Sequence, residues 1–114
     1  MEYATLNNGV RIPFLGFGVF QVENPAECEQ CVSEAIATGY RLIDTAAVYL
    51  NEEAVGRAVK KSGVPRKDFF ITTKVWIKDM GYEQTKSAFE RSLALINTTP
   101  YIRTGYLSYS HAFW

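Results

Sequence analysis

The chain has 114 residues, of which 47% are hydrophobic, and its twelve basic and twelve acidic side chains balance. This length supports one modest domain, and this apolar content predicts a packed core rather than a disordered chain. The sequence has no basic block, no signal-peptide pattern and no apolar run long enough for a membrane span, so we expect a cytoplasmic protein whose partners are neither nucleic acid nor membrane.

The first predicted elements are a hairpin and a short strand. Residues 5–12, TLNNGVRI, are typical of a β-hairpin, because Asn8-Gly9 supplies the positive φ angles of a type I′ turn. Residues 14–20, FLGFGVF, then predict a short strand that contains two glycines.

A helix is predicted next. Asn24 is a good helix cap, Pro25 suits the first helical position, and Gly39 marks the end of the helix. Apolar residues recur at helical spacing on one face, which we expect to be buried. These residues are Cys28, Val32, Ala35 and Ile36.

Cys28 and Cys31, in the segment CEQC, fall inside this helix. The pair has the spacing of a redox or metal site, but a zinc ion needs about four ligands and the one histidine, His111, is far along the chain. We therefore interpret both cysteines as buried thiols and expect no metal.

Strands and helices alternate in the rest of the chain. Strands are predicted at residues 40–43 and 69–73, and helices at 51–63 and about 82–96, with Asn51 as the cap of the first of these helices. The order, a hairpin followed by β-α-β-α-β-α, predicts an α/β fold with a parallel sheet. The apolar helix faces are Ala54, Val55, Ala58 and Val59, and then Ala88, Phe89, Ser92, Leu93 and Ile96.

Three polar residues follow two neighbouring strands of this sheet. Asp44 ends one strand, Tyr49 lies just after it, and Lys74 ends the next strand, so all three are expected at the same sheet edge. An ammonium beside a phenol stabilises the phenolate, and a carboxylate keeps the ammonium charged. Each residue alone has an ordinary structural explanation, but together they predict a tyrosine that donates a proton to a carbonyl oxygen.

Four segments resemble the aldo-keto reductase family. They are TLNNGVRIPFLGFGVF, GYRLIDTAAVYLNEEAVG, TTKVW and GYEQTKSAFERSL, and the resemblance covers residues 3–96. It implies a (β/α)8 TIM barrel that reduces aldehydes and ketones with NADPH. A complete barrel needs about 250 residues, so we expect the amino-terminal hairpin and the first three βα units of a partial barrel.

The resemblance also assigns roles to residues. It implies that Tyr49 is the proton donor, that Lys74 and Asp44 tune it, and that Asp44 contacts the nicotinamide end of NADPH. It implies that the substrate is enclosed by Phe20, Val48 and Trp76. His111 lies near, but slightly after, the position expected for a substrate-orienting histidine, and Leu50 stands where relatives often have glycine.

The resemblance ends after residue 96. Residues 97–114 are a divergent tail at the end of what we expect to be one barrel domain over residues 1–114. Shifting the codons of SYSHAFW, residues 108–114, by one base permits Leu-Ile-His-Met-Pro-Phe, which resembles the family motif missing here. We therefore expect a frameshift near Tyr101 and a premature end, in which case His111 is an accident of the wrong frame.

Two functions stay open. The first is an NADPH-dependent oxidoreductase that acts on a small-molecule carbonyl. We expect these 114 residues to be inactive when they are separated from the rest of such an enzyme. The alternative is an inactive truncated product that associates with other chains, or with itself, through its open sheet edge.

Overall fold

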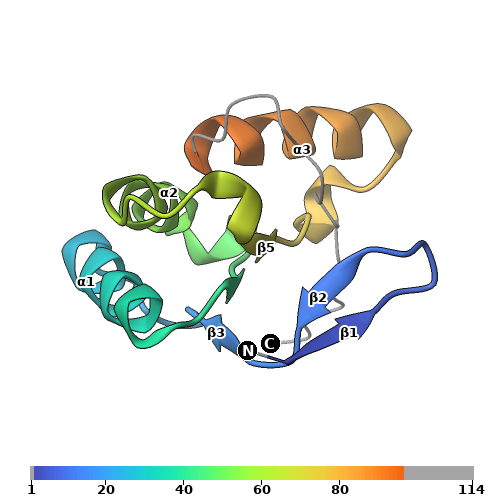
Figure 1. Ribbon diagram of the computed structural model, residues 1–114. Coiled ribbons are helices and arrows are strands. Elements are labelled where there is room, and N and C mark those ends of the chain that lie inside the picture. The colour runs from blue at the N-terminus through green and yellow to red at the C-terminus, as the bar shows by residue number, and fades with distance from the viewer. Residues whose placement is uncertain (1, 97–114) are drawn as a thin grey trace.

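The computed structural model describes residues 2–96 of the chain (Figure 1). Met1 and residues 97–114 lie outside the described residues, and so do the predictions about the tail and His111. The elements, with η marking a 3₁₀-helix, are β1 (Tyr3–Thr5), β2 (Arg11–Pro13), β3 (Gly16–Gly18), α1 (Pro25–Thr38), β4 (Leu42–Asp44), η1 (Ala47–Tyr49), α2 (Glu52–Lys61), η2 (Arg66–Asp68), β5 (Phe70–Thr72), η3 (Ile77–Asp79) and α3 (Tyr82–Ile96).

The hairpin prediction is confirmed, but the predicted turn type is wrong. β1 and β2 pair antiparallel, with Thr5 opposite Arg11. Within residues 2–96 the non-glycine residues with positive φ are Gln21 and Leu50, so Asn8 does not have the φ angle of a type I′ turn. In the Asn8-Gly9 pair only Gly9 takes positive φ, at +84°. The loop has room for this geometry because five residues, 6–10, separate the paired ends.

The parallel sheet is confirmed, and its strands are shorter than predicted. β3, β4 and β5 pair in parallel in that order, with Gly18 opposite Asp44 and Asp44 opposite Thr72. β4 begins at Leu42 rather than Tyr40, because the Tyr40 amide donates to the Ala35 carbonyl at the end of α1 (3.0 Å) and leaves the ladder.

The ends of α1 follow the sequence signals. The Asn24 side chain accepts a hydrogen bond from the Glu27 amide (3.0 Å) and Pro25 takes the first position. Gly39 ends the helix in the left-handed conformation, with φ at +117°. Asn51 takes the N-cap position of α2 as predicted, but its side chain makes no capping bond and hydrogen bonds to other parts of the chain instead.

The three helices lie along one side of the β3–β4–β5 sheet, and the hairpin lies on the other (Figure 1). Ile43 and Ile71 are register partners that point into the core beneath α1 and α2. The predicted faces of α1 and α2 are buried, and so are Ala88, Ser92 and Ile96 of α3. No helix within residues 2–96 is long and apolar enough to cross a membrane.

α1 and α2 are also joined by charged side chains. The Arg57 Nε atom lies 2.9 Å from the Glu29 Oε2 atom, and Lys61 pairs with the other carboxylate oxygen. Hydrogen bonds from Arg57 and Lys61 lower the pKa of Glu29. Because Arg57 and Lys61 lie on the exposed side of α2, we assign this network a small share of the stability.

Candidate functional site

The carboxyl end of the sheet brings Asp44 and Lys74 together. Asp44 is the last residue of β4, and Lys74 follows β5 by two residues, so the parallel register places both at one edge. The Lys74 Nζ atom lies 2.7 Å from the Asp44 Oδ2 atom and donates to the Thr45 carbonyl at 3.1 Å. The Lys74 side chain is only 17% exposed, whereas that of Asp44 is 41% exposed. The ammonium is therefore held inside the edge, with the carboxylate more open to solvent.

Thr72 supports this ion pair, and the sequence analysis missed it. Its hydroxyl donates to the Asp44 Oδ1 atom, so both carboxylate oxygens accept hydrogen bonds. The Thr45 amide donates to the Thr72 carbonyl and the Ala47 amide to the Lys74 carbonyl, at 2.8 and 3.1 Å, which extends the ladder past both strand ends. The contact between Thr72 and Asp44 could have been predicted from the parallel register, which places the two residues opposite each other.

Tyr49 joins the pair through its ring. It ends the short helix η1, and the Lys74 Nζ atom lies 5.3 Å from the centre of its ring. The Phe20 and Tyr49 rings pack against each other, with their centroids 5.4 Å apart and an angle of 54° between their planes. The three residues singled out in the sequence therefore meet, and their catalytic roles stay predictions.

A pocket of about 440 Å³ lies beside Tyr49. Phe20 and Val48, which were predicted to enclose the substrate, line it together with Tyr49. Trp76 is not among the lining residues of this pocket; it is half-buried and directly precedes η3, and its role as a substrate wall stays a prediction. The remaining lining residues are Gln21, Glu23 and Leu50.

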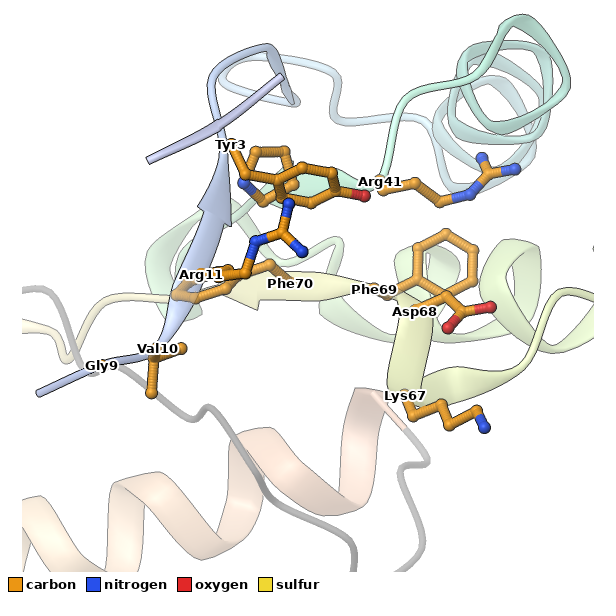
Figure 2. Close-up of a pocket in the computed structure, with 10 residues that line it drawn as sticks. Tyr3, Gly9, Val10, Arg11, Arg41, Lys67, Asp68, Phe69 and Phe70 are labelled. Carbon is orange, nitrogen blue, oxygen red and sulfur yellow. The ribbon is translucent and has the colours of Figure 1, made fainter. Parts of the chain in front are cut away.

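A larger pocket, of about 770 Å³, lies between the hairpin and the amino-terminal end of the sheet (Figure 2). The Arg11 guanidinium stacks on the Tyr3 ring at 4.3 Å, and the Arg41 guanidinium donates to the carbonyls of Ile36 and Tyr40. Figure 2 shows the Lys67 side chain extending away from Arg11 and Tyr3. Of the three cationic side chains that line the pocket, those of Arg11 and Arg41 are thus engaged within the protein. The pocket lies at the opposite end of the sheet from Lys74.

The cysteines do not form a disulfide. Cys28 is fully buried and Cys31 half-buried, and burial raises the pKa of the Cys28 thiol to about 11. Such a thiol is a poor nucleophile at neutral pH. Within residues 2–96 no group of three or more histidine, cysteine or acidic side chains is placed to hold a metal ion.

Sequence comparison identifies relatives with reductase names. The profile of the Aldo/keto reductase family matches residues 14–107. A glyoxal reductase of Bacillus subtilis (strain 168) is 58% identical over 88 residues, which are 77% of this chain and 32% of that protein. The chain spans about a third of the length of the curated relatives it matches.

Structure comparison gives the same result. The crystal structure of an aldo/keto reductase from Brucella melitensis superposes with a TM-score of 0.82 at 49% identity, over 85% of this chain and 38% of that one. The Bombyx mori aldo-keto reductase, solved in complex with NADP, has a TM-score of 0.80 at 33% identity, over 95% of this chain and 36% of that one. The predicted fold class, part of a TIM barrel that begins with a hairpin, is confirmed.

Proposed function

The chain belongs to the aldo/keto reductase family, and we propose that it supplies the proton-donating site of an NADPH-dependent reductase of aldehydes and ketones. The observation that carries this proposal is the contact of one half-buried ammonium, that of Lys74, with both the Asp44 carboxylate and the Tyr49 ring. A lysine used only for solubility would extend into water instead.

Carbonyl reduction needs a hydride at the carbon and a proton at the oxygen. When bound, NADPH would supply the hydride. The Tyr49 hydroxyl gives its proton to the carbonyl oxygen, and the Lys74 ammonium stabilises the phenolate that remains. The Asp44 carboxylate fixes the Lys74 ammonium in position. Phe20 and Val48 provide apolar walls that hold the substrate beside Tyr49.

The described residues fit the nicotinamide end of the cofactor. The Asp44 carboxylate is exposed enough to accept a hydrogen bond from a carboxamide or a ribose hydroxyl. Gly18 is its partner on β3, and a β-carbon built on Gly18 would meet no atom within 4 Å, so the space beside Asp44 is open. No lysine or arginine lines the pocket beside Tyr49, so the described chain offers little there for the phosphates of NADPH.

The substrate class is a small carbonyl compound. The relative named glyoxal reductase makes glyoxal a reasonable first probe, because the identity is 58% over 88 residues. The pocket walls are apolar at Phe20 and Val48 and polar at Gln21 and Glu23, which accommodates a short aldehyde with one polar end.

A graft tests the proposal. Residues 1–96 of this chain replace the matching segment of the Bacillus subtilis glyoxal reductase, and NADPH consumption with glyoxal is measured beside the unaltered reductase. We expect the graft to reduce glyoxal with a kcat within about tenfold of the unaltered enzyme, because the reacting groups are retained. A graft that folds and binds NADPH but does not turn over would contradict the proposal.

A second candidate function is association without catalysis. It is favoured by the sheet, in which β3 and β5 each pair on one side within residues 2–96, and by Phe14 and Leu15, which are 65% and 62% exposed. Unpaired strand edges and exposed apolar side chains promote self-association. A folded but inactive graft, together with oligomers of the 114-residue chain, would favour this candidate over the reductase.

A further inference from the structure

Two strained backbone positions flank the pocket beside Tyr49. Within residues 2–96 the non-glycine residues with positive φ are Gln21, at +62°, and Leu50, at +57°, and both line this pocket. Left-handed backbone at a non-glycine residue persists only where the surrounding structure holds it, and such strain concentrates at functional sites.

Gln21 lies in a tight turn, residues 19–22. The Val22 amide donates to the Val19 carbonyl at 3.2 Å, and Gln21 occupies the third position, where a positive φ usually selects glycine. Because a non-glycine residue takes this conformation only where its surroundings hold it, the turn needs a further restraint. The turn carries Phe20 and Gln21, one wall of the pocket.

Leu50 closes the other wall. It follows η1, and its amide donates to the Ala47 carbonyl at 3.3 Å. Residues 45–50, which form the loop between β4 and α2, carry both Val48 and Tyr49 into the pocket. The next residue is Asn51, whose side chain is almost completely buried.

Asn51 connects the two walls. Its Nδ2 atom donates to the Val19 carbonyl at 3.0 Å and to the Val22 carbonyl at 3.1 Å, so it holds both ends of the turn. Its Oδ1 atom accepts from the hydroxyl of buried Thr45 at 2.7 Å, at the start of the 45–50 loop. One side chain thus ties two segments that lie about thirty residues apart in the sequence.

We propose that Asn51 is a positioning residue that holds the turn 19–22 and the loop 45–50 against each other, and so fixes both walls of the carbonyl pocket beside Tyr49. This assignment rests on the proposed function for the identity of the pocket. The tether itself is a property of the chain, and it is tested without substrate or cofactor.

The test compares variants of the full 114-residue chain by hydrogen exchange and nuclear Overhauser contacts in NMR. In Asn51→Ala we expect the Val22 amide to exchange at least about tenfold faster, while amides in the middle of α1 keep their rates. We also expect the contact between the Phe20 and Tyr49 rings to be lost. Neither signal depends on reductase activity, so failure of the proposed function would leave this result intact.

Two further variants separate positioning from packing. Asn51→Asp keeps the volume of the side chain and the acceptor for Thr45 but cannot donate to both carbonyls, so it should behave like Asn51→Ala. Val32→Ala removes buried volume in α1 and should accelerate exchange globally while the ring contact remains. A wild-type ring contact in Asn51→Asp, or uniform acceleration in Asn51→Ala, would overturn the proposal.

Discussion

Lys74 is the residue on which the site depends. Its ammonium meets the Asp44 carboxylate, the Thr45 carbonyl and the face of the Tyr49 ring. The carboxylate and the carbonyl hold the ammonium in place, and there it lies 5.3 Å from the centre of the Tyr49 ring. Because the Lys74 side chain is only 17% exposed, removing Asp44 would leave the ammonium without its ionic partner at a place with little access to water.

Leu50 bears on stability rather than on chemistry. Its side chain is 85% exposed and its φ is +57°, a conformation that costs a non-glycine residue about 1–2 kcal/mol. Leu50→Gly removes this strain but gives the unfolded chain more freedom, worth about 0.4–1 kcal/mol. We expect a net gain of up to about 1 kcal/mol in the free energy of unfolding, measured in urea.

Leu50→Ala is the matched control. It also removes the exposed side chain but keeps the β-carbon, so its stability should stay within about 0.5 kcal/mol of the wild type. Equal stability of the glycine and alanine variants would show that backbone strain at this position has no measurable cost.

At the scale of elements, most of the fold could be predicted and most of the side-chain support could not. Helix α1 has both its end signals and its apolar face in the sequence, and it forms as predicted. Asp44 and Lys74 meet because parallel strands end together. The tether through Asn51 could not be predicted, because asparagine at a helix start usually caps and nothing local shows that the turn 19–22 lies within its reach. The role of Trp76 as a pocket wall stays a prediction.

Gly56 of α2 lies against the backbone at the end of α3. A β-carbon built there would lie 2.3 Å from the Ile96 carbonyl oxygen and 2.6 Å from its carbonyl carbon. Backbone atoms cannot move aside as a side chain can, so Gly56→Ala should lower the free energy of unfolding by about 1–3 kcal/mol. Alanine would ordinarily stabilise a helix relative to glycine by about 1 kcal/mol, so the sign of the change in the free energy of unfolding is informative by itself.

The control for Gly56 is Lys60→Ala on the exposed side of α2. It adds no contact with α3, and we expect a change within about 0.5 kcal/mol. Urea unfolding followed by circular dichroism measures both variants. A Gly56→Ala variant as stable as the wild type would mean that the two helices do not approach this closely in solution.

At the scale of the molecule, the two ends of the sheet differ. The carboxyl end carries Asp44, Tyr49 and Lys74, whereas the amino-terminal end carries the larger pocket, whose arginines are engaged with Tyr3 and with backbone carbonyls. Pocket size alone would favour the amino-terminal end. The proposed chemistry uses the carboxyl end instead, as is usual for barrels built from βα units.

The central claim is that Tyr49 donates the proton, and the kcat of the grafted reductase tests it most directly. Tyr49→Phe keeps the ring that packs on Phe20 and faces Lys74 and removes only the hydroxyl. We predict a loss of kcat with glyoxal of about 10²–10⁴-fold, with NADPH affinity, followed by cofactor fluorescence, nearly unchanged. A Tyr49→Phe graft that reduces glyoxal at close to the rate of the parent graft would show that the proton comes from another group.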